Sequence, residues 1–485
     1  MVFNSFKFWG FFLVFLVLYY LVCGKNKKAQ NIILLIASYV FYGIAEWKML
    51  PLLVGVTVAF YFLGIGIGKN IEKKPKISSL LTICALVISI GLLLYFKYFN
   101  FFISEFARLF NVLGFQVNYN TFNIIMPLGI SFFTFRIISY IVEVHRESME
   151  PTRDFIEFAA YIAFFPCILS GPIDRPNIFL PQLRNVRACT YENALNGGLQ
   201  FLWGLFKKVV IADNLSLVVD SVWSHYAGMS GSTLLLTAFL YVFEIYADFS
   251  GYSDMAIAVG RLMGIKVAKN FDCPLFSLNI ADFWRRWHMS LTTMLTDYVF
   301  MPLNFTFRKL KNAGMVLAII INFVLVGLWH GANWTFVLFG LFHGLLYIPL
   351  IISGAMNEKT NIKTGFWGLP SLKDFGRMVL TITFVMIGSV IFRADSIGQA
   401  FGYFGQMFSG SLISIPGFVG VNNTLAIISI LYIAFMLLMD WNYRKKDFVL
   451  QDTKSPVKLA IVVSFMVVSI YYFGASAQTF IYFQF

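Results

Sequence analysis

The most informative polar residue in this sequence is His330, which follows a long apolar run. The run begins near Met315, directly after a basic loop. Fifteen helical residues carry the chain about 22 Å, so His330 is expected within a hydrocarbon layer of about 30 Å. Ionisable groups at such depth are costly and commonly functional, and a neutral imidazole there can act as a general base. The alternative is a structural histidine satisfied by a carbonyl of a neighbouring helix.

The residues around His330 favour a functional interpretation. Gly331 allows the helix to end and frees backbone amides, and Asn333 is positioned in sequence to orient the imidazole. Trp329 flanks the ring on its other side. His343 follows thirteen residues later and could line the same cavity, but its small neighbours favour a packed histidine.

A second histidine closes the segment 282–288, which reads Asp-Phe-Trp-Arg-Arg-Trp-His. Helical spacing would put Trp284 and His288 on one face and would pair Asp282 with Arg286. Trp and Arg also collect at membrane interfaces for physical reasons alone. A functional site and an interfacial belt are therefore equally compatible with this segment.

Other charged residues also lie in apolar surroundings. The stretch around residues 249–253 is flanked by three acids: Glu244, Asp248 and Asp254. Acids at membrane depth must be paired or protonated, which favours a buried structural network over the alternative of a proton relay. Lys207 and Lys208 follow another apolar run, where they would either attract phosphates or mark the cytoplasmic side.

The composition excludes an ordinary soluble protein. Of 485 residues, 59% are hydrophobic and 13% are charged, whereas soluble domains carry about 25% charged residues. The net charge of +13 falls in short loops, as orientation in a bilayer requires, so nucleic-acid binding is not expected. The five cysteines form no CxxC or Cys/His spacing, and neither a metal nor a disulfide is predicted.

Apolar runs recur from end to end, which predicts an all-α polytopic membrane protein lying in a lipid bilayer. The runs are 7–23, 31–48, 51–68, 79–97, 122–142, 197–213, 233–250, 315–330, 334–353, 376–393, 424–440 and 457–474. The basic loops after the first and third runs are expected in the cytoplasm, which puts both termini outside. Residues 155–175 are broken by Pro and Gly and predict a re-entrant element, and residues 275–300 predict an amphipathic helix.

Six motifs in this order resemble the membrane-bound O-acyltransferase (MBOAT) family, in its bacterial alginate O-acetylase and peptidoglycan O-acetyltransferase-like branch. They span about residues 120–345 and lie at Pro127–Phe135, Phe164–Ile173, Gly204–Lys208, Tyr246–Asp254, Phe283–His288 and Leu328–Gly331. The resemblance implies one integral domain over 1–485, with about 11–12 transmembrane helices around a central tunnel. It also implies that His330 is the tunnel histidine and His288 the second catalytic residue. The same motifs and their surroundings supply candidate substrate-binding residues: Trp329, Asn333, Trp287, Arg285, Ser250 and Asp254.

The activity that this resemblance implies is O-acetylation of a cell-surface polysaccharide such as alginate, peptidoglycan or another exopolysaccharide. Acetyl-CoA would be the cytoplasmic donor, and no bound cofactor is expected. An extracytoplasmic SGNH/GDSL-type acetyltransferase or esterase-like partner would receive the acetyl group. The chain would lie in a bacterial inner membrane.

The C-terminal residues 480–485 read Phe-Ile-Tyr-Phe-Gln-Phe, an F-x-Y-x-x-F pattern after the last run at 457–474. The pattern resembles the end of a small partner peptide in the D-alanylation branch of the family. This resemblance makes Tyr482 a candidate acyl relay, with His330 as its base, because a tyrosine of pKa near 10 is a poor nucleophile alone. The alternative is an aromatic anchor at the membrane interface.

Three other functions remain open from the sequence. D-alanyl transfer to teichoic acid is the nearest, but that branch keeps the tyrosine motif on a separate peptide. A polysaccharide or lipid transporter would show paired broken spans, and no matching half is found. A scaffold for polymer machinery would tolerate loss of His330.

Overall fold

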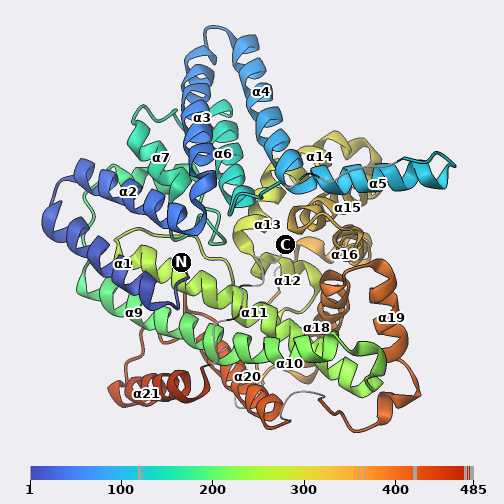
Figure 1. The fold of residues 1–485 in the computed structure, drawn as a ribbon. Coiled ribbons are helices and arrows are strands. Elements are labelled where there is room, and N and C mark those ends of the chain that lie inside the picture. The colour runs from blue at the N-terminus through green and yellow to red at the C-terminus, as the bar shows by residue number, and fades with distance from the viewer. Residues whose placement is uncertain are drawn as a thin grey trace. The chain divides into compact units, whose positions relative to one another are not determined.

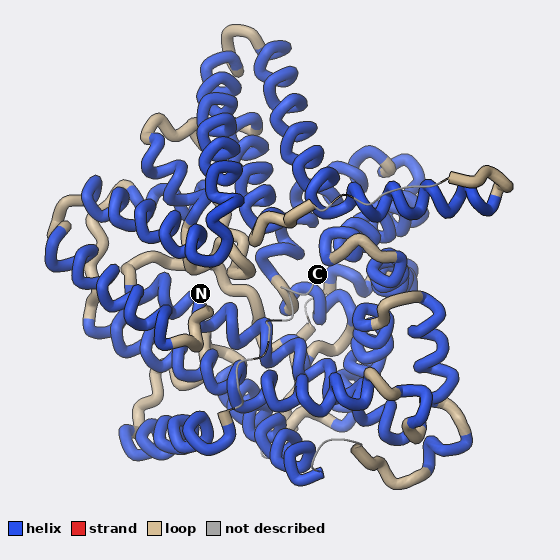
Figure 2. Tube along the Cα trace, in the orientation of Figure 1, coloured by secondary structure: helices blue, strands red, loops and turns tan. Residues whose placement is uncertain are grey.

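The computed structural model of the chain describes residues 2–117, 122, 124–358, 360–365, 368–418, 423–474, 478 and 480. Helices account for 75% of the structure, and these residues form no strand. Figure 2 shows helices joined by loops throughout. The prediction of an all-α polytopic fold is confirmed.

Contacts divide the chain into two compact units. Unit 1 comprises Met1–Gly198 with Ala256–Ala268, and unit 2 comprises Leu199–Met255 with Lys269–Phe485. Helices α9 (Tyr191–Phe206) and α11 (Gly231–Leu262) contribute residues to both units. The single integral domain over residues 1–485 stays a prediction.

Unit 1 is built from a helical hairpin and the helices around it. The long helices α3 and α4 run side by side, and α6 contacts both (Figure 1). The helices of this unit are α1 (Phe6–Leu16), α2 (Lys27–Glu46), α3 (Leu50–Asn70), α4 (Pro75–Leu93), α5 (Phe99–Val112), α6 (Ile130–His145), α7 (Phe155–Ala163) and α8 (Pro176–Leu183).

The start of α6 corrects one predicted span. The apolar run 122–142 was expected to be helical throughout, but the helix begins only at Ile130. Gly129 precedes it with φ 73°, and a side chain there would come within 2.1 Å of the Ile168 carbonyl oxygen. Only glycine fits a positive φ and so close a backbone approach, so the chain turns sharply before the helix.

The irregular part of the predicted 155–175 element lies inside the protein. After α7, residues Phe164–Asp174 are non-helical and buried. The buried Arg136 guanidinium satisfies part of this backbone by donating to the Pro172 carbonyl at 3.4 Å, and it lies 3.6 Å from the Asp174 carboxylate. Irregular backbone in an apolar region requires such internal partners.

Unit 2 contains the helices that carry the candidate site. Helices α15 (Lys311–His330) and α16 (Trp334–Leu345) pack closely, and α16 also contacts α18 (Leu372–Arg393). A side chain on Gly340 of α16 would come within 2.2 Å of the Phe323 carbonyl oxygen of α15, so glycine permits this approach. The remaining helices of this unit are α10 (Asp213–Trp223), α12 (Ile280–Arg286), α13 (Met289–Leu295), α14 (Met301–Thr306), α15 (Lys311–His330), α16 (Trp334–Leu345), α17 (Ile348–Ile352), α18 (Leu372–Arg393), α19 (Ile397–Met407), α20 (Asn423–Tyr443) and α21 (Pro456–Phe473).

Eight helices among the described residues are long and apolar enough to cross a membrane. The predicted runs 31–48 and 51–68 fall in one apolar stretch, Lys27–Asn70, and the first run forms a shorter helix, Phe6–Val22. The runs 122–142 and 197–213 are not among the eight. The chain is therefore a multi-pass membrane protein with fewer helices of spanning length than the twelve runs predicted.

Candidate active site

A small apolar cavity lies within unit 2 at the end of α15. Its volume is about 50 Å³. Residues from α11, α12, α15, α16 and α18 line it: Val242, Ile245, Phe283, Trp284, Trp287, His330, Phe339, His343, Val385, Ser389 and Phe392. Two histidines and one serine are thus the polar residues of an otherwise hydrophobic wall.

His330 is the last residue of α15 and is 6% exposed. Its imidazole stands edge-on to the ring of Phe392 at 5.1 Å and to that of Phe339 at 6.1 Å between centroids. Gly331 leaves the helix in an extended conformation, so the predicted helix end at this position is confirmed. The packing holds the imidazole at the cavity wall.

Asn333 does not have the contact predicted for it. Its side-chain oxygen accepts from the Thr335 N–H at 3.1 Å and caps α16, while its amide donates to the Asp395 carbonyl at 2.8 Å. This side chain therefore fixes the turn between α15 and α16, and it is not among the cavity-lining residues.

His343 is both packed and part of the cavity wall. The Trp284 indole N–H donates to its Nδ1 at 3.3 Å. Because indole is only a donor, His343 accepts at Nδ1 and carries its proton on Nε2. Its Nε2 lies against Gly388 of α18, where a methyl group would come within 2.4 Å.

The backbone at His288 differs from the predicted continuous helix. Helix α12 ends at Arg286, Trp287 is extended, and His288 has φ 45° and ψ 50°, in the left-handed region. A positive φ is uncommon outside glycine, although histidine adopts it more readily than most residues, and such positions cluster at functional sites. Helical spacing therefore fails to describe the relation of His288 to Trp284, although the predicted pair Asp282–Arg286 is present at 2.9 Å.

Asn270 fixes the orientation and tautomer of His288. Its Oδ1 accepts from the Ser290 N–H at 3.3 Å and the Ser290 hydroxyl at 2.9 Å, and it lies 3.0 Å from His288 Nδ1. Because this atom accepts from a backbone N–H, it is the amide oxygen, which can only accept hydrogen bonds. His288 must therefore donate through Nδ1 and carry its proton there. Asn270 is fully buried, and burial lowers the pKa of His288 to about 3. His288 is therefore neutral at physiological pH.

Sequence reasoning missed Asn270. It lies eighteen residues before His288 in an irregular segment, Lys269–Cys273, that has no periodic pattern. A lone Asn beside a Phe in such a segment gives no signal of a long-range contact. Only the fold brings the two together.

Aromatic rings connect the two predicted catalytic histidines. Trp329 lies 4.9 Å from the His330 ring and 5.6 Å from the His288 ring. Phe249 of α11 stands edge-on to His288 on another side, at 4.7 Å. The structure thus brings Trp329, His288 and His330 together, with Trp287 in the cavity wall.

The remaining predicted binding residues lie outside the cavity wall. The Arg285 guanidinium donates to the backbone carbonyls of Met356 at 2.9 Å and Glu358 at 3.3 Å. Ser250 and Asp254 both receive hydrogen bonds from the buried Lys207, at 2.8 and 2.7 Å. Their role in substrate binding stays a prediction. Tyr482 lies outside the described residues.

The donor set does not suggest a metal centre. Among the residues that the structure describes, no three His, Cys, Asp or Glu side chains cluster so as to hold an ion. What the site offers is two imidazoles next to a small apolar volume inside a membrane protein. Such a group can accept a proton from a nucleophile while water is excluded. The fold and cavity are therefore those of a polytopic membrane protein with a candidate general-base site.

The chain belongs to the MBOAT, membrane-bound O-acyltransferase, family, whose sequence signature matches residues 39–389. It is 36% identical over 461 residues to the probable alginate O-acetylase AlgI of Pseudomonas aeruginosa, covering 94% of this chain and 84% of that protein. It is 32% identical over 426 residues to the peptidoglycan O-acetyltransferase of Helicobacter pylori, covering 82% and 75%. It is also 34% identical over 285 residues to the teichoic acid D-alanyltransferase of Streptococcus thermophilus, covering 55% and 68%. The predicted family is confirmed, and the chain is a membrane O-acyltransferase.

Proposed function

We propose that this enzyme takes acetyl from cytoplasmic acetyl-CoA and delivers it across the membrane for O-acetylation of a cell-surface polysaccharide. The observation that carries the proposal is the small apolar cavity at His330. A cavity needs about 10–15 Å³ to hold one water, so a volume of about 50 Å³ suits a short acyl group such as acetyl and not a long acyl chain. The relatives that cover most of this chain are an alginate O-acetylase and a peptidoglycan O-acetyltransferase, which supports the same acyl group.

In the proposed reaction His330 acts as the general base. It takes the proton from an acceptor hydroxyl as that oxygen attacks the thioester carbonyl carbon. The tetrahedral intermediate collapses with cleavage of the carbon–sulfur bond, and the imidazolium returns the proton to the CoA thiolate. Protons balance within one turnover, so no other cofactor is required.

Tyr482 is our candidate for the first acceptor. Its ester would then pass the acetyl group to an extracytoplasmic SGNH/GDSL-type partner, which would acetylate the polymer. The buried, neutral His288 would assist by accepting a hydrogen bond through Nε2, because Asn270 occupies its Nδ1. This assignment rests on the tautomer and not on the helical face predicted earlier.

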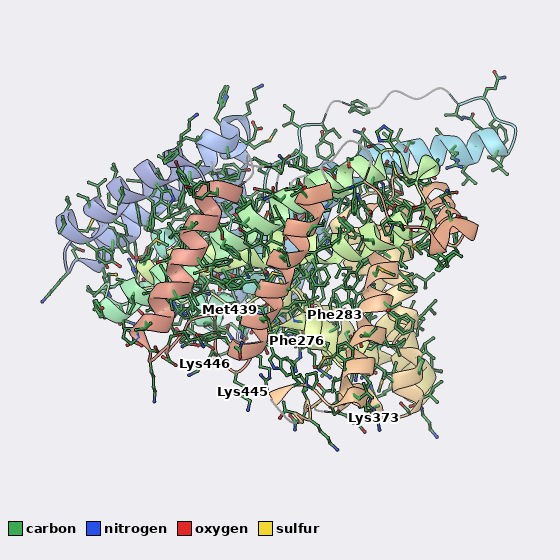
Figure 3. All side chains as sticks on the ribbon, turned by 90° about the horizontal axis from the view of Figure 1, so that it is seen from below. Phe276, Phe283, Lys373, Met439, Lys445 and Lys446 are labelled. Atoms are coloured by element: carbon green, nitrogen blue, oxygen red, sulfur yellow. The ribbon has the colours of Figure 1, made fainter. Side chains whose placement is uncertain are left out.

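The proposed orientation in a bacterial inner membrane puts the basic loops in the cytoplasm and both termini outside. The start of α18 and the end of α20 are neighbours, since the Trp441 indole donates to the Gly368 carbonyl at 3.1 Å. Lys373, Lys445 and Lys446 lie along one edge in Figure 3. Basic residues gathered at one end of neighbouring helices support a common cytoplasmic side.

The test uses purified full-length protein in detergent with acetyl-CoA labelled in the acetyl group. Mass spectrometry of the C-terminal peptide compares the wild type with His330→Ala and Tyr482→Phe. Label on the wild type alone supports acetyl transfer, His330 as base and Tyr482 as relay. A wild type that consumes no acetyl-CoA, with or without the partner, would contradict the proposed donor.

D-alanyl transfer to teichoic acid is the second candidate. The teichoic acid D-alanyltransferase covers 55% of this chain, against 94% for the alginate O-acetylase. A cavity with few polar residues is also a poor match for a charged amino group. A D-alanyl thioester of a carrier protein, offered in parallel to acetyl-CoA, discriminates the two.

A further inference from the structure

Lys207 and Lys208 lie in the interior of unit 2, and neither solvent nor headgroups surround them. They begin a π-helical stretch, Lys207–Ala212, between α9 and α10. Their exposed fractions are 2% and 7%. A π-helical turn inserts an extra residue and is frequent at functional sites; here it turns two consecutive lysines toward α11.

Lys208 is held between two buried carboxylates. Its Nζ lies 2.8 Å from Asp213 and 2.7 Å from Asp248. Buried charges are costly unless further hydrogen bonds satisfy them. The Lys208 ammonium therefore requires hydrogen-bond partners on every side, and a third polar group lies beside the two carboxylates.

The further group is the main chain of Gln478, beyond the last helix. Its carbonyl oxygen accepts from Lys208 Nζ at 3.4 Å. The cation of the Lys208–Asp213 ion pair thus binds the main chain of this residue. Because the contact is to the backbone, it does not depend on which side chain stands at position 478.

An aromatic contact holds the same segment two residues later. Phe480 is 3% exposed. Its ring stacks on Tyr252 with centroids 4.7 Å apart, lies 6.1 Å from Phe249 and is 5.9 Å from Lys208 Nζ. Phe249 in turn stands against His288 at 4.7 Å, so a single ring separates Phe480 from a candidate catalytic histidine.

We propose that Lys208, Asp213, Phe249 and Tyr252 form a binding site for the C-terminal segment of this chain and position that segment at the candidate active site. We name these four residues the tail clamp. The ion pair binds the main chain at residue 478, and the two rings bind the aromatic side chain at residue 480. This inference rests on the proposed function, because it gives the C-terminal segment a place next to the histidines.

The experiment measures docking and acetyl transfer separately in the full-length protein. Gln478→Cys provides a reporter, because the tail clamp binds the backbone and not the side chain at this position. Modification of this cysteine by a maleimide is followed by mass spectrometry of the C-terminal peptide, so native cysteines do not interfere. Labelled acetyl-CoA, as above, reports transfer.

In this background Phe480→Ala and Asp213→Asn are expected to speed maleimide modification about tenfold or more, because loss of an aromatic or ionic anchor raises the open population. Both are expected to lose most of the acetyl label. Tyr471→Ala is the matched control, because Tyr471 of α21 is 80% exposed. This variant and His330→Ala should leave the modification rate at its reference value. Phe480→Leu should recover part of the protection, which separates a contact effect from misfolding.

Two results would overturn the inference. One is an unchanged modification rate in both Phe480→Ala and Asp213→Asn. The other is faster modification with acetyl transfer intact, which would remove the positioning role. A clamp that protects residue 478 in a protein that never transfers acetyl would uphold the binding site and refute the proposed function instead.

Discussion

Val385→Ala should change which acyl group the enzyme accepts. Val385 lies on α18, is 8% exposed and forms part of the cavity wall. The cavity of about 50 Å³ has room for roughly four water-sized groups, so an acetyl group fits and the extra methylene of propionyl fills what remains against the wall. Sites of this kind discriminate one methylene by about 10–200-fold, and we expect the wild type to prefer acetyl within that range.

Removing two methyl groups from the wall makes room for the extra methylene of propionyl. Burial of this methylene is worth about 0.8 kcal/mol, which corresponds to an increase of about fourfold in the rate with propionyl relative to acetyl. Relief of overpacking adds to this increase. The acetyl-to-propionyl preference should therefore fall by at least about fourfold. The assay compares single-turnover rates with acetyl-CoA and propionyl-CoA.

Val390→Ala is the matched control for this prediction. Val390 lies on the same helix and is fully buried, but it does not line the cavity. Both variants should lose about 1–3 kcal/mol of stability, so any general loosening affects them alike. An unchanged preference in Val385→Ala, or an equal change in Val390→Ala, would refute the assignment of this cavity to the acyl group.

Two further changes test the histidine neighbours. Asn270→Asp places a carboxylate next to His288 Nδ1, which favours the charged imidazolium and raises the pKa of His288 from about 3. The rate of acetyl transfer by this variant should then decline as the pH falls from about 8 to 5. The wild type and Asn270→Ala should show no decline in rate from protonation of His288 in this range. Superimposable pH profiles of Asn270→Asp and wild type would contradict this role. Gly388→Ala should push His343 off the Trp284 hydrogen bond and cost about 1–3 kcal/mol of stability, measured by thermal unfolding in detergent. Gly376→Ala on the same helix, where nothing lies within 4 Å, should cost nothing, and equal losses in both would be the contrary result.

Local patterns were sufficient to predict the helical fold and the position of His330. Hydropathic runs give helices because a backbone in lipid must satisfy its own hydrogen bonds, and Gly331 marks the end of α15 in the sequence itself. The same reasoning failed at residue 122, because the close approach of Gly129 to the Ile168 carbonyl is a long-range contact. It also failed at His288, where periodicity assumes a helix and the chain adopts a left-handed turn.

Charged residues were the hardest to interpret from sequence. Lys207 and Lys208 follow an apolar run, as lysines at a membrane boundary do, and only the π-helical turn and the acids of α11 show that they are internal. The carboxylates that neutralise them lie 5 to 47 residues away. A one-dimensional pattern carries no information on such pairs, although it did favour a buried structural network around Asp248 and Asp254.

The three buried histidines differ in what the surrounding residues leave available for chemistry. Trp284 donates to Nδ1 of His343, so that ring keeps its proton on Nε2, which abuts Gly388. Asn270 accepts at Nδ1 of His288, so that ring offers Nε2 as an acceptor. His330 alone combines a helix end, a ring at the cavity wall and aromatic neighbours on several sides. A base must be able to turn its lone pair toward the acyl acceptor, and His343 lacks that freedom. In the proposed mechanism His330 therefore transfers the proton and His288 accepts a hydrogen bond, while His343 forms part of the cavity wall.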